Sequence, residues 1–198
     1  MLTVIDSIWD KKLNIKTCGS DYSELDAHNF GYDPTPYYCL KKLAKSGLIT
    51  SSDIFVDYGC GMGRACFAMN RFTGAKAIGI DLNPRFLKIA EDNLDSFGRS
   101  GNIEFILEDA ALYMPCEGSV FYFYNPFSCD IQLKVLENIK SYSIRSGTEI
   151  KLIFLQPIKH VEQALSEEDI TLIKKIDLRP LVRSKTNRMF MFIYKYPA

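Results

Sequence analysis

The sequence lacks long hydrophobic runs, paired cysteines and clustered histidines. No stretch reaches the roughly eighteen apolar residues of a membrane-spanning helix, so no membrane partner is expected. The six cysteines form no C-x-x-C pair, and His28 and His160 stand apart, which makes a metal site unexpected. The opening MLTVIDSIWDKK is charged too early for a secretory signal peptide. We therefore expect a cytoplasmic protein with free thiols.

An excess of charge of either sign is also missing. The chain has 24 Lys and Arg residues and 24 Asp and Glu residues, so non-specific attraction to nucleic acid phosphates is not favoured. The most basic stretch runs from residue 174 to residue 188, and solvated strand and loop faces explain it. No basic arm or added RNA-binding domain is visible. The sequence thus gives no strong nucleic-acid signal.

The composition is that of a globular chain with a single core. Of its 198 residues, 47% are hydrophobic and 24% are charged, and there is no internal repeat, low-complexity tract or long linker. Residues 1–198 are therefore interpreted as one domain. Within it, residues 1–50 are weakly periodic and are expected to form a cap or lid on a core that spans residues 51–198.

Short apolar segments alternate with helical patterns through this core. The expected strands are residues 54–58, 77–80, 102–107, 121–124, 150–155, 169–177 and 189–195. Most are separated by amphipathic segments, one of which starts at Asn83 as N-cap with Pro84 in the first position, and an earlier helix is expected to start at Thr35 and Pro36. This alternation predicts an α/β fold: a Rossmann-like, doubly wound sheet of seven mostly parallel strands with helices on both faces. Because no helix is evident between the last two strands, they are expected to form a hairpin that inserts antiparallel.

A glycine loop follows the first expected strand. In VDYGCGMGR the strand ends near Asp57, and Gly59, Gly61 and Gly63 alternate before a helix. Glycine allows a ligand to approach the backbone closely, and the helix N-terminus offers N–H groups to an anion. The spacing G-x-G-x-G differs from the dinucleotide fingerprint G-x-G-x-x-G, which weakens a nicotinamide or flavin interpretation without excluding it.

Acidic residues end the second and third strands. Asp81 lies in IGIDLNP, beside the glycine loop in a doubly wound sheet, where it can accept hydrogen bonds from both hydroxyls of a ribose. Asp109 and Ala110 follow the third strand, where a carboxylate could receive the amino group of adenine and a neighbouring N–H could meet a ring nitrogen. Each aspartate also has a purely structural interpretation, as a turn residue for Asp81 and a helix cap for Asp109.

The fourth strand ends in an unusual way. FYFYNPF runs from residue 121 to residue 127, and its apolar stretch stops at Asn125, Pro126 and an aromatic residue, Phe127, that is expected to be exposed. Such an ending can be a turn or the floor of an active site. The ends of the three preceding strands favour the second interpretation.

These motifs together resemble the class I S-adenosylmethionine-dependent methyltransferases. The resemblance rests on VDYGCGMG, IGIDLNP, EDA and FYFYNPF in that order at the ends of successive strands. More closely, YDPTPY at residues 32–37, DYGCGMGR and YNPF resemble a small bacterial group of methyltransferases, whose distant relatives include lysine methyltransferases without a SET domain.

The resemblance implies S-adenosyl-L-methionine as cofactor and assigns residues to it. Its methionine part would be held by Asp57 and the three glycines, with Asp57 facing the ammonium. Asp81 would hold the ribose hydroxyls, and Asp109 with Ala110 would read the adenine. The flanking Met62 and Leu82 are expected to pack in the core.

The same resemblance places Asn125, Pro126 and Phe127 where amino-group methyltransferases carry Asp/Asn-Pro-Pro-aromatic. The Asn oxygen and a backbone carbonyl can accept both hydrogens of an amino group, proline keeps the segment rigid, and the aromatic ring can stack on the substrate. One proline stands where the enzymes that methylate nucleobases and glutamine have two, which leaves the substrate class open. Tyr32 is expected to act as a lid or substrate wall, while Tyr32, Asp33 or His28 could take a proton.

The function predicted from the sequence is methyl transfer to an acceptor that is a protein, a small molecule or a nucleotide, with an amino nitrogen favoured. Two alternatives remain open. An NAD-dependent oxidoreductase would use Gly59, Gly61 and Asp81, and a non-catalytic module would bind S-adenosylmethionine without turnover. The spacing G-x-G-x-G and the ending Asn125-Pro126-Phe127 do not fit the oxidoreductase. Every cofactor position that the resemblance implies is retained, which argues against decay to a binding module.

Overall fold

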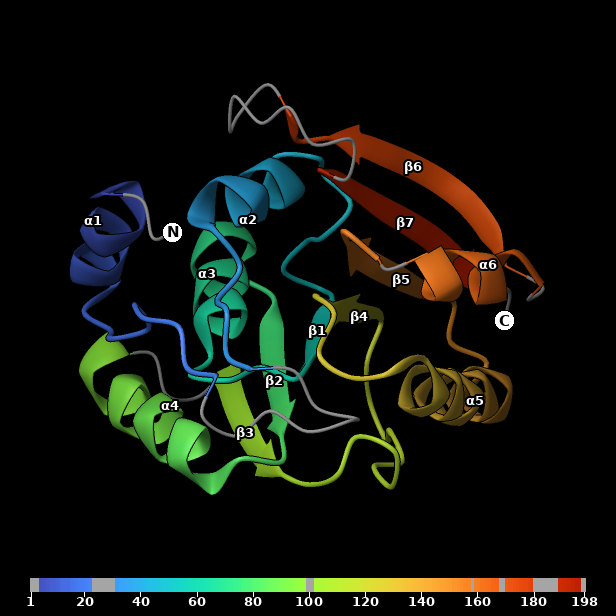
Figure 1. The fold of residues 1–198 in the computed structure, drawn as a ribbon, viewed down its shortest axis with the longest axis horizontal. Helices are drawn as coiled ribbons and strands as arrows, with labels where there is room; N and C mark the ends of the chain where they lie inside the picture. Colours follow the sequence, from blue (N-terminus) through green and yellow to red (C-terminus); the bar gives the residue numbers. More distant parts are fainter. Residues whose placement is uncertain are drawn as a thin grey trace.

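The computed structural model describes residues 4–22, 31–98, 102–157, 159–167, 170–179 and 189–196. In this part of the chain, seven strands form a single sheet in the order β3-β2-β1-β4-β5-β7-β6, with helices on both faces (Figure 1). The five strands β1 to β5 run parallel, and β7 lies antiparallel between β5 and β6. This order differs from the 3-2-1-4-5-6 order of the dinucleotide-binding fold.

The sheet and its helices are bounded as follows. The strands are β1 (Ile54–Tyr58), β2 (Lys76–Asp81), β3 (Ile103–Leu107), β4 (Val120–Phe123), β5 (Ile150–Leu155), β6 (Thr171–Asp177) and β7 (Phe190–Tyr196). The helices are α1 (Val4–Leu13), α2 (Tyr37–Ala44), α3 (Arg64–Thr73), α4 (Pro84–Phe97), α5 (Cys129–Ser146) and α6 (Lys159–Glu167).

The predicted sheet of seven mostly parallel strands and the antiparallel hairpin are confirmed, and two local predictions are wrong. Helix α6 was not expected between the last parallel strand and the hairpin. Thr35 does not cap α2, which begins at Tyr37 after Pro36. The Thr35 hydroxyl instead lies 3.0 Å from the Tyr122 hydroxyl, and the carboxylate of Asp6 on α1 accepts from the Tyr37 N–H at 2.9 Å. The turn expected at residues 184–187 lies outside the described residues.

Alternate residues of each strand pack into a core on either face of the sheet. On one face, Phe55 and Tyr122 pack with α2 and α3. On the other face, Val56 and Phe121 pack with α5 and α6. Asn83 starts α4 as predicted, because its side chain accepts from the N–H groups of residues 85 and 86. Both cores therefore hold the carboxyl ends of β1, β2 and β4 at one edge of the sheet.

A buried ionic cluster fastens the N-terminal segment to α3. Arg64, which is 2% exposed, lies 4.0 Å from Asp6 and 3.7 Å from Asp10. Its guanidinium also donates to the Thr17 hydroxyl at 2.7 Å and to the Thr17 carbonyl at 3.0 Å, and it lies over the Tyr37 ring. These contacts place the segment that was expected to form a cap directly beside the glycine loop.

None of the helices that the structure describes is both long enough and apolar enough to cross a membrane.

Candidate active site

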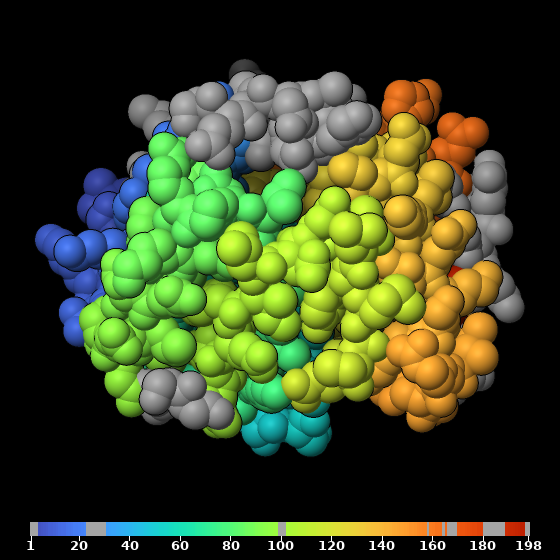
Figure 2. Space-filling model, turned by 90° about the horizontal axis from the view of Figure 1, so that it is seen from below, coloured from blue at the N-terminus to red at the C-terminus, as the bar shows by residue number. Residues whose placement is uncertain are grey.

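A pocket of about 320 Å³ opens at the carboxyl ends of β1, β2, β3 and β4. Figure 2 looks onto this edge, where green α4, the yellow-green segment after β3 and yellow α5 lie side by side. The volume is within the usual range for ligand sites. The lining includes every residue predicted for the site except Gly63: Tyr32, Asp57, Gly59, Gly61, Asp81, Asp109, Ala110, Asn125, Pro126 and Phe127.

The glycine loop forms the back of the pocket. The N–H groups of Gly59 and Cys60 both donate to the Ile80 carbonyl, at 2.8 and 3.1 Å. Gly61 has φ +54°, and a Cβ added there would lie 2.5 Å from the Tyr32 ring. Gly63 instead packs inward, where a Cβ would meet Phe105 at 2.5 Å. The loop thus brings bare backbone to the pocket at Gly59 and Gly61, while Gly63 serves close packing.

Asp57 places a buried carboxyl group at the pocket wall. It is 4% exposed, and the Cys66 thiol donates to its Oδ2 with the sulfur at 3.9 Å. Burial raises the pKa of Asp57 well above its usual range, and the neighbouring Asp81 carboxylate raises it further. A cationic ligand group in the pocket would offset this burial cost, so Asp57 is suited to an ammonium.

Asp81 ties the end of β2 to the glycine loop. Its Oδ2 accepts from the Gly61 N–H at 2.7 Å, and its Oδ1 accepts from the Asn83 N–H at 2.8 Å. Burial raises the pKa of this carboxyl, although these backbone N–H groups oppose the shift. Each carboxylate oxygen has a second lone pair, so the pair of oxygens can still accept from two adjacent hydroxyls.

The segment after β3 supplies the third acidic side chain. Asp109 Oδ1 accepts from the Ala111 N–H at 2.8 Å, which fixes a turn, while Leu112 and Tyr113 donate to the Asp109 carbonyl. The structural role that the sequence allowed was a helix cap, but the structure has a turn and no helix at this position. In the part of the chain that the structure describes, no protein acceptor is bound to the Ala110 N–H, which leaves it available to a ligand nitrogen.

The segment after β4 holds Asn125 in an uncommon conformation. Its φ is +44°, in the left-handed region, and its Nδ2 donates to the Gln156 carbonyl at 2.9 Å. Gln156, directly after β5, also has a positive φ of +50°. Pro126 packs directly on Gly59, so the segment after β4 touches the glycine loop.

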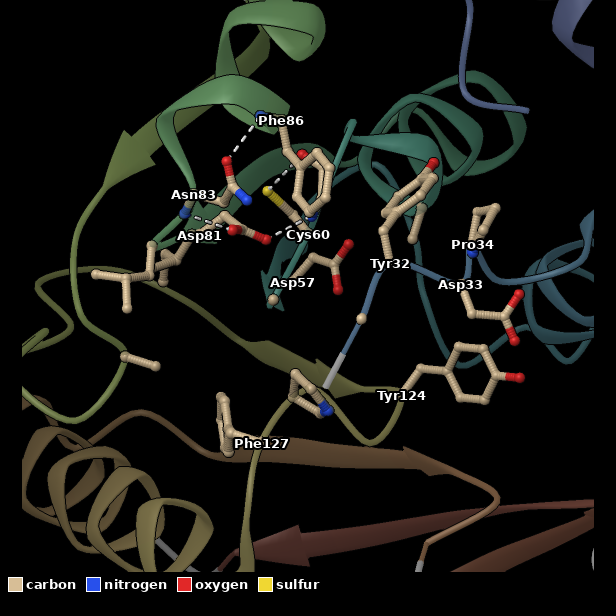
Figure 3. A pocket seen from close by; sticks show the side chains of 18 of the residues that line it. Tyr32, Asp33, Pro34, Asp57, Cys60, Asp81, Asn83, Phe86, Tyr124 and Phe127 are labelled. Atoms are coloured by element: carbon tan, nitrogen blue, oxygen red, sulfur yellow. Dashed lines mark hydrogen bonds between the residues drawn. The ribbon is translucent and has the colours of Figure 1, made fainter. Parts of the chain in front are cut away.

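Aromatic side chains close the pocket (Figure 3). Phe127 is 6% exposed, so the expectation of an exposed ring is wrong: it packs against α5 residues while still bordering the pocket. The Tyr32 ring lies against Phe86 at 5.2 Å, and its hydroxyl turns away and donates to the Thr17 carbonyl at 2.7 Å. Burial raises the pKa of Tyr32, so this residue is a wall and is unsuited to taking a proton.

Sequence reasoning missed several lining residues, among them Tyr124, Phe86 and Leu82. Tyr124 was assigned to a strand, and Phe86 lies in the amphipathic segment expected after Asn83 and Pro84, yet both border the pocket. Leu82 was expected in the core, but it is 53% exposed at the pocket edge. No local pattern separates these aromatic and aliphatic residues from core residues. His28, one of the residues that could take a proton, lies outside the described residues.

Comparison with known proteins connects this geometry with a family. Residues 49–142 match the family described as "Methyltransferase domain". The structure resembles that of an RNA methyltransferase from Salinibacter ruber in complex with S-adenosyl-L-homocysteine, with a TM-score of 0.61 and 18% identity over 83% of this chain and 94% of that one. The chain contains a class I S-adenosylmethionine-dependent methyltransferase domain.

Curated relatives of this methyltransferase domain include the ribosomal protein L11 methyltransferase of Edwardsiella ictaluri (strain 93-146). It is 36% identical over 81 residues, which are 41% of this chain and 27% of the relative. The ribosomal protein L11 methylase of Lactobacillus delbrueckii subsp. bulgaricus has a similar fold, with a TM-score of 0.56 and 14% identity over 82% of this chain and 79% of that one. The chain thus spans about a quarter of the length of the curated relatives it matches.

The pocket of the methyltransferase domain fits S-adenosylmethionine, its cofactor. The fit is seen in the buried carboxyl of Asp57, in the bare backbone at Gly59 and Gly61, and in the paired oxygens of Asp81. A dinucleotide would also need the longer glycine fingerprint, which this loop lacks.

The Gly61 backbone provides a direct test of the cofactor site. Gly61→Ala is expected to weaken S-adenosylmethionine binding by about a hundredfold, because the added Cβ meets the Tyr32 ring at 2.5 Å and displaces a pocket wall. Isothermal titration calorimetry measures the affinity. Gly47→Ala is the matched control, since Gly47 has φ +74° and nothing lies within 4 Å of its added Cβ. Equal affinity losses in both variants would show that backbone strain alone is responsible.

Proposed function

We propose that this protein transfers a methyl group from S-adenosylmethionine to a nitrogen atom of an acceptor held at Asn125. The observation that carries the proposal is the hydrogen bond from Asn125 Nδ2 to the Gln156 carbonyl. It commits the amide nitrogen, so that Oδ1 is the atom free to act as an acceptor, with no donor bound to it within the described residues. An amide oxygen fixed in this way can orient the lone pair of an amino group.

The cofactor residues form part of the same proposal. Asp57 would face the ammonium, Asp81 the ribose hydroxyls, and Asp109 with Ala110 the adenine. This assignment is supported by their positions at the ends of successive parallel strands and by the free Ala110 N–H. Gly63 is proposed to support the loop through its packing on Phe105 rather than through contact with the cofactor.

The protein groups would act by alignment and by exclusion of water. When bound, S-adenosylmethionine supplies an electrophilic methyl carbon on a sulfonium. Asn125 Oδ1 would accept from the acceptor N–H, and Pro126 would keep the adjoining backbone rigid. Phe127 and the Tyr32 ring would exclude water from the nitrogen. Since the Tyr32 hydroxyl already donates to Thr17, a proton-transfer role for it is not part of this proposal.

The names of the relatives indicate proteins and RNA as acceptors for those enzymes. For this chain we propose a nitrogen acceptor in one of these classes. We also propose that residues 1–198 act as one domain, in which residues 1–50 cap the core. Arg64 supports this one-domain arrangement, because it ties the N-terminal segment to α3 through Asp6, Asp10 and Thr17. A cytoplasmic location stays a prediction from the sequence.

Calorimetric titration with S-adenosylmethionine, S-adenosylhomocysteine and NADH tests the cofactor part of the proposal. The first two are expected to bind and NADH is not. The affinity for S-adenosylmethionine should fall by about tenfold per pH unit once the pH drops below the raised pKa of Asp57, because protonation removes the charge that faces the ammonium. Above that pKa the carboxylate is already ionised, and the affinity should level off.

Asp57→Asn separates this effect from general acid sensitivity. The variant should bind S-adenosylmethionine more weakly at neutral pH and should lose the acid-range pH dependence, since the amide does not titrate. An unchanged pH profile in Asp57→Asn would contradict the role given to this residue. Failure of the wild-type folded protein to bind either nucleoside would contradict the proposed function as a whole.

A further inference from the structure

The acceptor side of the pocket is acidic and aromatic, and this composition indicates a substrate class. We propose that the acceptor is a positively charged primary amine on a basic protein segment, and that Asp33 together with Tyr124 selects it. This inference rests on the proposed function, because it concerns the same pocket. Nothing in the comparisons assigns a role to Asp33 or Tyr124.

Carboxylates outnumber basic groups around the pocket. The acidic lining residues are Asp21, Asp33, Asp57, Asp81, Glu108 and Asp109. Among the described lining residues the basic side chain is Arg64, and its charge is already matched by Asp6 and Asp10. Arg85, near the rim, is bound to Asp21 at 3.0 Å. The pocket therefore presents net negative charge to an approaching acceptor.

Asp33 lies on the acceptor side of the pocket. It has no role in the cofactor assignment. It is exposed, lies between Tyr32 and Pro34, and has no ion-pair partner within the described residues. Figure 3 shows its carboxylate near the Tyr124 ring, on the opposite side of the pocket from Asp81. Burial raises the pKa of Tyr124, and the Asp33 charge raises it further, which agrees with their proximity. Asp33 and Tyr124 together form one wall of the mouth.

This wall suits an ammonium and disfavours a phosphate. A cation at the mouth would be attracted by the Asp33 charge and by the face of the Tyr124 ring. The phosphates of a polynucleotide would meet like charge at Asp33, Glu108 and Asp109. Lys175 and Arg179 lie over aromatic rings of β7, but neither residue lines the pocket. Arg179 is bound to Asp177 at 2.7 Å.

The reacting amine must lose a proton before transfer. As it moves from the mouth toward Asn125 and Phe127, desolvation disfavours the ammonium, and its proton passes to water. The neutral nitrogen then forms the N–CH3 bond while the S–CH3 bond breaks, and that electron pair stays on sulfur. The product leaves as a methylated ammonium, so the reaction releases one proton overall and requires no other reactant.

Two polymers of opposite charge test this inference. The protein is incubated with radiolabelled S-adenosylmethionine and either poly-L-lysine or total bacterial RNA, and incorporated label is measured. Label is expected in poly-L-lysine and not in RNA. Asp33→Asn should lower kcat/KM for poly-L-lysine by about tenfold at low salt, chiefly through KM, and the difference should shrink at high salt because the attraction is screened.

The matched control is Asp92→Asn, which removes an exposed carboxylate from α4 that pairs with Lys88 and does not line the pocket. It should leave kcat/KM unchanged. Equal activity of Asp33→Asn and wild type would overturn the role of Asp33. Label in RNA alone, or in neither polymer, would overturn the substrate class if calorimetry still shows S-adenosylmethionine binding. Loss of that binding in the wild-type protein would instead refute the proposed function.

Discussion

Asn125→Ala is expected to lower kcat for methyl transfer by on the order of a hundredfold to a thousandfold, with S-adenosylmethionine affinity changed by less than about threefold. The expected loss arises because Asn125 Oδ1 is proposed to orient the acceptor nitrogen, while its Nδ2 is held by the Gln156 carbonyl. The cofactor residues on β1 and β2 do not depend on this amide. Initial rates with a methylated acceptor and calorimetry with the cofactor give the two values.

The backbone at Asn125 requires its own control, because φ is +44° and alanine is strained there. Asn125→Gly removes the side chain and tolerates this conformation, so it should lose as much activity as Asn125→Ala while unfolding at a higher urea concentration. Asn125→Asp keeps an oxygen at Oδ1 but places a second oxygen against the Gln156 carbonyl, and it should also be impaired. Near-wild-type turnover in Asn125→Gly would exclude the side chain from the reaction.

Arg64→Met is expected to reduce the free energy of unfolding by about 3–5 kcal/mol, because it leaves buried Asp6 and Asp10 without a countercharge. Both carboxylates keep hydrogen bonds, from Tyr37 and Thr17, but their charges lose the guanidinium. Urea denaturation followed by circular dichroism measures the change. Arg71→Met on the same helix is the control, since Arg71 is exposed and should change stability by less than about 0.5 kcal/mol.

The position of Trp9, the chain's single tryptophan, makes this experiment more specific. Its ring on α1 packs against Phe72 at 5.2 Å, and Lys41 lies over it at 4.0 Å. In Arg64→Met, Trp9 emission should therefore shift to the red at lower urea than the loss of circular dichroism, as α1 leaves the core. Arg64→Lys keeps the charge but loses the planar guanidinium. Its stability should therefore lie between that of Arg64→Met and that of the wild type. If the fluorescence and circular dichroism transitions of Arg64→Met coincide and its stability equals that of the wild type, the cluster does not hold the N-terminal segment.

Much of the core was predictable because local patterns decide it. The strands β1 to β5 are short apolar runs bounded by turn residues, and Asn83 with Pro84 carries its capping signal within four residues. The strand-end residues could be placed together because parallel strands align their carboxyl ends. Their shared location at one edge of the sheet could therefore be predicted before any contact was known.

Contacts between distant segments were not predictable in this way. Arg64 looked like an ordinary residue after a glycine loop, and its partners Asp6 and Thr17 lie in a segment without clear periodicity. Thr35 satisfied the local rule for a helix cap, yet its hydroxyl forms a hydrogen bond with the Tyr122 hydroxyl from β4. Phe127 was expected to be exposed but is buried, because it packs against α5. Leu82 was expected in the core but is exposed, because it lies at the edge of the pocket.

The packing of Pro126 on Gly59 limits how this protein can be redesigned or recombined. The two loops come from different parts of the sequence, but neither can change its volume without displacing the other. A chimaera that imports a new acceptor segment after β4 would also need the matching residue in the glycine loop, or its cofactor affinity would change. Substitutions at positions 59 and 126 are therefore expected to be non-additive, so a library that varies acceptor preference should vary both together.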